Sequence, residues 1–271
     1  MRSLATRLLR TERRLATRKS EPTLLYCDPV FFAHQRLGFD PDEWQEKVLQ
    51  SESKRLLLNC CRQSGKSTTT AALALHVALY TPQALVLLVS PSLRQSAELF
   101  RKVQGFLSAL PVRPARVEDN KLSLQLRNGS RIVSLPSTEA TIRGFSGASL
   151  IIEDEAARVT DELFYALRPM LAVNNGRHIL MSTPWGRRGH FFEAWENGGP
   201  GWTRIKITAH QCPRIPASFL AEEQRSMPKL WFDSEYNCEF TEVDGTVFRY
   251  DDLLVALSAD VEPVKLGGVA A

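Results

Sequence analysis

Four short runs of almost continuous apolar character recur along the chain, at residues 55–59, 84–90, 148–152 and 178–183. Runs of this length and composition are typical of strands that are buried on both faces of a parallel sheet. Helix-like segments lie around them, at residues 39–49, 68–79, 92–110 and 161–171. Because strands and helices alternate, the sequence predicts an α/β fold with helices on both faces of a mainly parallel sheet.

Residues 122–135 follow a different pattern, in which apolar and polar positions alternate strictly around Asn128-Gly129. An Asn-Gly pair suits the tight turn of a β-hairpin, because both residues tolerate positive φ angles. The alternation therefore predicts two antiparallel strands joined at Asn128-Gly129.

The chain divides by pattern into four parts. Residues 1–35 form a basic N-terminal arm and residues 36–208 form the α/β core. Residues 209–250, in which prolines punctuate two short helical runs at 219–225 and 231–240, are expected to form a small lid subdomain. Residues 251–271 read as a linker or tail.

The arm is marked by its charge, since residues 1–20 contain seven cationic side chains and one acid. Leu4, Leu8 and Leu15 are spaced for one helical face, which indicates an amphipathic arm that docks on a partner subunit or on nucleic acid. An organellar transit peptide has a similar composition and is the third interpretation of this segment, after docking on a partner subunit and binding to nucleic acid.

Composition narrows the class of protein. A chain of 271 residues with 44% hydrophobic content is long enough for one large domain and a small one, and no apolar run approaches the length of a membrane span. The five cysteines include the adjacent pair Cys60-Cys61 and suggest neither a disulfide framework nor a zinc site, so a reducing cytoplasm is expected. The net charge of +4 permits a polyanionic partner without requiring one.

Residues 60–67 carry the most informative motif, Cys-Cys-Arg-Gln-Ser-Gly-Lys-Ser, between a predicted strand and a predicted helix. This is the context of a phosphate-binding loop, in which backbone N–H groups and the helix N-terminus bind nucleotide phosphates. Lys66 would reach the β- and γ-phosphates and Ser67 would bind Mg²⁺. Cys60 stands where the usual pattern has Gly, and a helix start with a capping Ser is the alternative. The predicted nucleotide-binding residues of the loop are Cys61, Arg62, Gln63, Ser64, Gly65, Lys66, Ser67 and Thr68.

A second motif ends the apolar run at 148–152, where Glu153, Asp154 and Glu155 follow it. The carboxyl edge of a parallel sheet is where ligands bind. Asp154 suits the acid that holds the Mg²⁺ shell, and Glu155 suits the general base that activates the attacking water. An acidic helix N-terminus is the alternative for this motif alone. Together the two motifs need the same Mg²⁺, and they predict ATP hydrolysis.

Further candidates follow the same order along the chain. Gln45 has the amide needed to read an adenine edge, with a solvated helical Gln as the alternative. Ser182 and Thr183 end an apolar strand and carry small hydroxyls that could sense the γ-phosphate and couple its state to a moving segment. An ordinary strand exit stopped by Pro184 is the alternative there.

Two arginines are candidates for stabilising the charge of the transition state. Arg62 lies within the phosphate loop and could act in the same chain. Arg143 lies on a Gly-containing loop, Thr-Ile-Arg-Gly, shortly before the acidic motif. It suits an arginine finger given to a neighbouring subunit, with a surface salt bridge or a DNA phosphate contact as alternatives.

These motifs, in this order, resemble the ATPase part of the large terminase subunit, the DNA-packaging motor of tailed bacteriophages. The resemblance covers roughly residues 36–250 and rests on the Arg-Gln-x-Gly-Lys-Ser loop, Thr-Ile-Arg-Gly, Ile-Ile-Glu-Asp-Glu-Ala and Ser-Thr-Pro. It implies a RecA-like P-loop NTPase fold of the ASCE type, with ATP and Mg²⁺ as cofactors. The roles given above to Gln45, Arg62 to Ser67, Asp154, Glu155, Ser182-Thr183 and Arg143 match the family's functional residues.

The resemblance also implies partners. These are double-stranded DNA, a homo-oligomeric ring on a portal protein and a small terminase subunit, in the host bacterial cytoplasm and not in the mature virion. The candidate DNA contacts are Arg101, Lys102, Lys121, Arg127 and Arg131. Such subunits normally continue into a nuclease domain, for which 23 residues after Phe248 are too few (271 − 248), so no nuclease activity is expected.

Two other functions stay open on the sequence. Asp-Glu-Ala and Ser-Thr-Pro also resemble helicase motifs, which leaves a helicase-like DNA translocase as the nearest rival. A non-catalytic module that binds nucleotide in order to assemble is the other, although Lys66 and Glu155 argue against it.

Overall fold

The computed structural model describes residues 28–136 and 144–241, and the described residues contain a central sheet of eight strands in the order β3-β4-β5-β2-β6-β7-β1-β8. The strands are β1 (Arg55–Cys60), β2 (Leu85–Ser90), β3 (Arg116–Asp119), β4 (Ser123–Leu126), β5 (Arg131–Pro136), β6 (Leu150–Asp154), β7 (Arg177–Ser182) and β8 (Thr203–Ile207). All pairs from β5 to β8 are parallel, and β3 and β4 are antiparallel at one edge.

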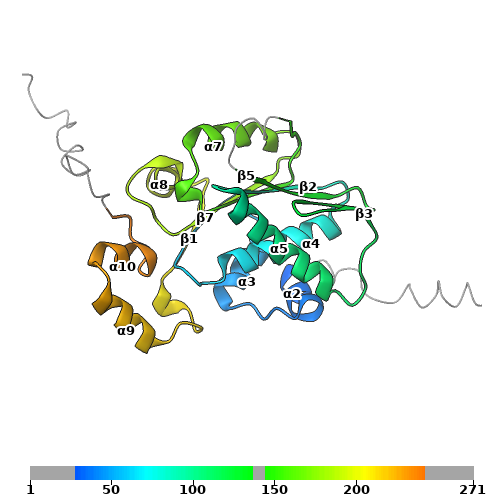
Figure 1. Cartoon of the computed structure of the whole chain (residues 1–271). Coiled ribbons are helices and arrows are strands. Elements are labelled where there is room, and N and C mark those ends of the chain that lie inside the picture. Colours follow the sequence, from blue (N-terminus) through cyan, green and yellow to red (C-terminus); the bar gives the residue numbers. More distant parts are fainter. Residues whose placement is uncertain (1–27, 137–143, 242–271) are drawn as a thin grey trace, which may run out of the picture.

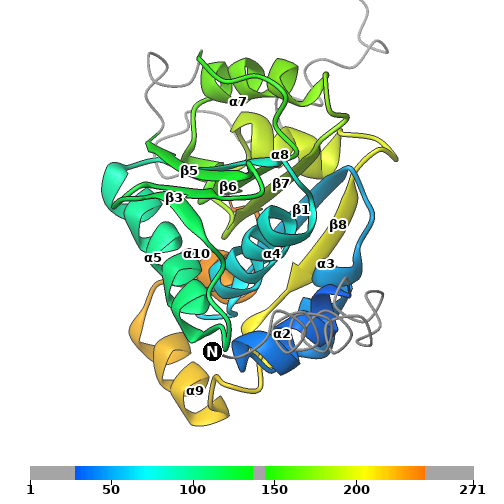
Figure 2. The same cartoon turned by 90° about the vertical axis from the view of Figure 1, so that its right-hand side faces the viewer.

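Helices cover both faces of this sheet (Figures 1 and 2). One face carries α2 (Pro29–Leu37), α3 (Glu43–Gln50), α4 (Lys66–Tyr80) and α5 (Leu93–Ala109), and the other carries α7 (Asp161–Leu167) and α8 (Gly189–Glu196). Side chains of a strand alternate between the two layers: Leu56 and Leu58 pack in the core on the α4 side, whereas Leu57 packs with Phe191 of α8. The predicted α/β class is thus confirmed.

The predicted strands and the hairpin are also present, the latter as the antiparallel pair β4 and β5. The helix predicted at 161–171 is divided, because Pro169 has no N–H to donate to the preceding turn. The α-helix ends at Leu167 and continues as the 3-10 helix η3 (Arg168–Leu171).

The N-terminal boundary of the core differs from the prediction. Helix α2 begins at Pro29, capped by Asp28 Oδ1, which accepts the N–H of Phe31 at 2.7 Å. Phe32 and Ala33 are buried in the core. Residues 29–35, predicted to belong to the arm, therefore pack in the core, and residues 1–27 lie outside the described residues.

The C-terminal part contains η4 (Ala209–Gln211), α9 (Ala217–Ser226) and α10 (Lys229–Glu235), and Figure 1 shows the last two side by side away from the sheet. Pro216 and Pro228 stand at the N-caps of α9 and α10, which explains why the prolines separate the two helical runs. A backbone bond ties this part to the core, because Arg62 N–H donates to the carbonyl of Glu235 in α10 at 3.1 Å. The lid predicted at residues 209–250 includes these helices, and residues 242–250 lie outside the described residues.

Candidate functional site

The predicted phosphate loop connects β1 to α4 at the carboxyl edge of the sheet. Gly65 lies at the helix start with φ +94°, a left-handed conformation that favours glycine. A Cβ at this position would lie 2.5 Å from Gln45 Nε2, so a larger residue would have to displace the Gln45 amide. The N–H groups of Thr68 and Thr69 both donate to the Gly65 carbonyl and close the first helical turn. The N–H groups before them have no acceptor within the helix and are suited to bind an anion.

A cavity of about 620 Å³ opens beside this loop. Six of the predicted loop residues contribute to its wall, together with four residues from other parts of the chain. The lining is Arg62, Gln63, Gly65, Lys66, Ser67, Thr68, Lys102, Glu155, Arg214 and Ile215.

Lys66 and Glu155 meet in this cavity, with Nζ 3.7 Å from Oε1. Burial alone would lower the pKa of the Lys66 ammonium, but the carboxylates of Glu155 and Asp154 outweigh it and raise that pKa. Lys66 is therefore a buried cation at neutral pH, fixed at the base of the cavity beside two acids.

Ser67 and Asp154 meet next to this pair, with Ser67 Oγ 3.4 Å from Asp154 Oδ2. Burial and then the nearby Glu155 raise the pKa of Asp154 to about 6. The hydroxyl and the carboxylate are hard oxygen donors of the kind that Mg²⁺ takes, and a buried carboxylate gains from a nearby cation. The two side chains therefore fit the Mg²⁺ site predicted from the sequence.

Glu155 reaches the cavity because β6 ends in a sharp turn. Its backbone adopts φ 54° and ψ 42°, a left-handed conformation that is uncommon for a residue other than glycine. The Glu155 N–H donates to Asp154 Oδ1 at 3.1 Å, which holds this turn. Conformations of this kind cost about 1–3 kcal/mol and concentrate at functional sites.

Gln45 does not line the cavity, contrary to its predicted role in reading an adenine edge. Its side chain is buried, and both ends of its amide are already bonded within the protein. Oε1 accepts the N–H of Asp42 in a capping box at the start of α3, and Nε2 donates to the carbonyl of Ser64 at 3.3 Å. In this arrangement Gln45 supports the phosphate loop.

Arg214, which the sequence analysis missed, stands at the cavity wall near Gln45. Its guanidinium donates to the Ser64 carbonyl at 2.7 Å and forms an ion pair with Asp42 at 2.7 Å. It thus fastens the region after β8 to the phosphate loop. Nothing in the local pattern around Arg214 marks it, since it lies 148 residues after Lys66 (214 − 66) and outside any motif.

The remaining loop residues divide between the cavity and the core. Arg62 lies on the cavity wall, with 70% of its side chain exposed and its Nε 3.5 Å from Glu235 Oε2 in α10. Cys61 and Ser64, also predicted to bind nucleotide, are buried and do not line the cavity. The Cys61 thiol instead lies 3.6 Å from the Cys212 thiol, where it packs against the region after β8.

Lys102 was predicted to contact DNA, but the structure places it in this cavity. Its Nζ donates to Thr68 Oγ1 at 3.3 Å from helix α5. The other predicted DNA contacts are exposed: Arg101, Lys121, Arg127 and Arg131.

Ser182 and Thr183 are buried at the end of β7 and do not line the cavity. Strand β7 lies between β6 and β1, and Met181 pairs with Asp154. Ser182 pairs with Asn59 at the end of β1. The two hydroxyl residues thus lie between the strands that carry Asp154 and the phosphate loop. Arg143 lies outside the described residues.

A buried network of hydrogen-bonded Glu, His and Asp side chains adjoins the site on the α7 and α8 face. Glu153 is fully buried and contacts two imidazoles, His178 Nε2 at 2.6 Å and His190 Nε2 at 3.2 Å. His190 Nδ1 lies 3.2 Å from Asp161 Oδ1, and the ring of Phe164 stacks on both imidazoles. The sequence analysis counted Glu153 as an acid at the strand end and missed this role.

Within residues 28–136 and 144–241, no cluster of three or more His, Cys, Asp or Glu side chains is arranged to hold a metal ion. In the same residues, no helix has the length and apolar character of a membrane span.

Comparison with known proteins places this geometry in a family. Residues 57–255, more than half of the chain, match the model described as terminase large subunit, T4likevirus-type, N-terminal. The chain is 26% identical over 210 residues to the terminase large subunit of Escherichia phage T5, covering 74% of this chain and 47% of that protein. It is 26% identical over 265 residues to the corresponding protein of Thermus virus P23-45, covering 85% and 55%. The chain thus spans about half the length of these relatives.

Solved structures share the fold. The large terminase ATPase domain of Thermus phage P74-26 superposes with a TM-score of 0.68 at 23% identity, over 78% of this chain and 97% of that one. The HK97 bacteriophage large terminase superposes with a TM-score of 0.64 at 16% identity, over 79% and 54%. The large terminase of a thermophilic bacteriophage, solved in complex with ADP, has a TM-score of 0.64 at 10% identity, over 74% and 54%.

Proposed function

We propose, from the premise that this chain belongs to the terminase large-subunit family, that it hydrolyses ATP with Mg²⁺ and drives double-stranded DNA into a viral procapsid. One observation carries the proposal. Two stretches 88 residues apart (154 − 66) converge in one cavity, where Lys66 contacts Glu155 and Ser67 contacts Asp154. This is the combination of cation, hydroxyl and two carboxylates that phosphoryl transfer to water needs.

The four side chains have separate roles in the proposed reaction. Lys66 and the N–H groups at the start of α4 bind the phosphates, and Ser67 and Asp154 hold Mg²⁺. When bound, Mg²⁺ neutralises charge on the phosphate oxygens. Glu155 orients the attacking water and accepts its proton.

Two further cations on the cavity wall extend the nucleotide site. Lys102 lies beside Thr68 on the α4 side, and Arg214 lies beside Ser64 near α3. Because Arg214 follows β8 in the chain, nucleotide that contacts it would bind the loop and the lid region together. Arg62 lines the same cavity and would stabilise the charge of the transition state within the same chain.

Coupling of hydrolysis to movement would pass through the residues that follow Thr183. The carbonyl of Pro184 accepts a hydrogen bond from Ser234 Oγ of α10 at 2.8 Å, and Trp185 packs edge-on against Trp231. Ser182 and Thr183, between β6 and β1, thus lead directly into contacts with the lid region. A shift at the end of β7 would move α10.

The proposed assembly is a homo-oligomeric ring on a portal protein, with a small terminase subunit as a further partner, in the host bacterial cytoplasm and outside the mature virion. Arg143 would act as an arginine finger for the neighbouring subunit. DNA would be held through its phosphates by Arg101, Lys121, Arg127 and Arg131, largely without regard to sequence.

The test of this function is phosphate release measured against protein concentration, with and without double-stranded DNA and Mg²⁺. We expect release to require Mg²⁺ and to rise more steeply than linearly with concentration, because a finger given to a neighbour acts only in assemblies. Linear dependence would contradict the finger, whereas absence of Mg²⁺-dependent release under all conditions would contradict the ATPase function.

Substitution Lys66→Ala is expected to weaken ATP binding roughly 10- to 100-fold, because a hydrogen-bonded ammonium in a buried site contributes about 1.5–3 kcal/mol. Titration with a fluorescent ATP analogue measures this. The exposed Lys229 on α10, replaced by Ala, is the matched control and should leave affinity unchanged. Equal affinity of both variants would mean that Lys66 does not contact the nucleotide.

A further inference from the structure

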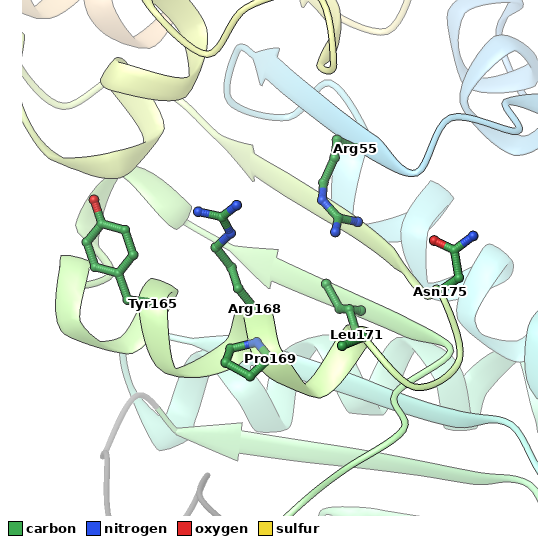
Figure 3. Close-up of a pocket in the computed structure, with 7 residues that line it drawn as sticks. Arg55, Tyr165, Arg168, Pro169, Leu171 and Asn175 are labelled. Carbon is green, nitrogen blue, oxygen red and sulfur yellow. The ribbon is translucent and has the colours of Figure 1, made fainter.

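A second depression lies at the amino edge of the sheet, away from the nucleotide cavity. Its volume is about 400 Å³ and it is formed where the start of β1 faces the segment that joins α7 to β7 (Figure 3). A strand of six residues spans roughly 20 Å, and the phosphate loop follows the other end of β1. The lining is Arg55, Tyr165, Arg168, Pro169, Leu171, Ala172 and Asn175.

Two guanidinium groups face this depression from opposite sides (Figure 3). Arg55 is held in place by the protein, since its Nη1 donates to the carbonyls of Lys54 at 2.8 Å and Gly176 at 3.1 Å. Arg168 rises from η3 and lies over the ring of Phe164 at 5.7 Å. The Arg55 guanidinium is thus held by hydrogen bonds, and the Arg168 guanidinium lies over an aromatic ring.

The two cations are not neutralised by a carboxylate in the part of the chain that the structure describes, where neither forms an ion pair. Burial and then the charge of Arg168 lower the pKa of Arg55. Like charges that face one depression repel each other, and an anion between them would convert the repulsion into two attractions. The arrangement therefore stabilises a bound anion.

We propose that this depression binds a phosphate group and that the ligand is a phosphodiester of the DNA backbone, an inference that rests on the proposed function and adds a contact to it. Arg55 donates from the β1 side, while Arg168 and the hydroxyl of Tyr165 lie on the α7 side (Figure 3). The two guanidinium groups reach the depression from different sides, and guanidinium groups bind phosphate in bidentate fashion. The site would hold DNA at the sheet edge opposite to the one that binds ATP.

The test is fluorescence anisotropy of a labelled double-stranded DNA with the full chain, over a series of salt concentrations. Arg168→Gln is expected to weaken binding roughly three- to tenfold and to lower the slope of log affinity against log salt by about one, because one phosphate contact is lost. Arg55→Gln should act in the same way, and the double variant should lower the slope by about two. Arg225→Gln, an exposed arginine on α9, is the matched control.

Two further readouts make the result decisive. Release of phosphate from ATP without DNA should be unchanged in all variants, so that loss of DNA binding is distinguishable from failure of the proposed ATPase. Thermal shift with inorganic phosphate tests the other source of the ligand: a stabilisation of the parent protein that is lost in Arg168→Gln, with DNA binding intact, would assign the site to a free anion and overturn the assignment to DNA. Unchanged DNA binding together with an unchanged phosphate response in both variants would overturn the site itself.

Discussion

Substitution Glu155→Gln is expected to reduce phosphate release from ATP by roughly 10²- to 10⁴-fold, the range that a positioned general base contributes. Gln has nearly the same shape as Glu but cannot accept the proton of the attacking water. The variant also removes the carboxylate that lies 3.7 Å from Lys66 Nζ, and it leaves that ammonium beside Asp154. Lys66 is therefore still available for the phosphates, and ATP affinity should be kept.

Single-turnover phosphate release and titration with a fluorescent ATP analogue separate these two effects. Glu162→Gln in the first turn of α7 is the control, because it removes an exposed carboxylate a short distance along the chain. Equal rates for Glu155→Gln and the parent protein would exclude Glu155 as the base. Loss of affinity in the variant, with the rate at saturating ATP kept, would instead assign Glu155 to positioning of the loop.

The sequence was sufficient for the parts of the site that depend on chain direction. Lys66 and Ser67 follow β1, and Asp154 and Glu155 end β6 or directly follow it. Carboxyl ends of parallel strands meet at one edge, so a correct assignment of the strands is enough to bring these side chains together. The same reasoning needs no knowledge of how the helices pack.

The sequence was not sufficient where the direction of a side chain depends on packing between distant segments. Gln45 lies on a helix next to the loop, but its amide serves the capping box with Asp42. Lys102 was predicted to face DNA and instead reaches Thr68, because α5 packs beside α4. Arg214 enters from a region with no motif. Each of these placements depends on a contact between distant segments, which a local sequence pattern cannot predict.

Edge elements were also missed, for a physical reason. Strand β8 alternates charged and apolar residues over only five positions and lies at the edge of the sheet, so it lacks the continuous apolar character that marked the central strands. Helix α8 is likewise short, from Gly189 to Glu196. Its buried His190 explains its position, since that imidazole bonds to Glu153.

The network around Glu153 leads to the second large expected effect. Substitution Glu153→Gln should lower the free energy of unfolding by about 3–5 kcal/mol, because two buried hydrogen bonds to the charged carboxylate are weakened and each contributes about 1.5–3 kcal/mol. The amide has a single acceptor oxygen, whereas the carboxylate contacts both imidazoles, those of His178 and His190, at 3.2 Å or less. For a chain of this size the melting temperature should fall by roughly 10 °C. Thermal and urea denaturation measure the change, with the exposed Glu196→Gln on α8 as the control.

The pH dependence of that difference identifies its cause. Burial alone would raise the pKa of Glu153, but His178 and then His190 outweigh it and lower the pKa from 4.5 to about 2. A carboxylate with a depressed pKa in the folded state stabilises the fold above its unfolded pKa and loses that contribution as the pH falls through the folded value, here about 3 kcal/mol in total. The stability difference between the parent protein and Glu153→Gln should therefore shrink as the pH falls from 4.5 towards 2. A difference that stays constant down to about pH 3 would show that the substitution acts through packing and that the charge of Glu153 does not stabilise the fold.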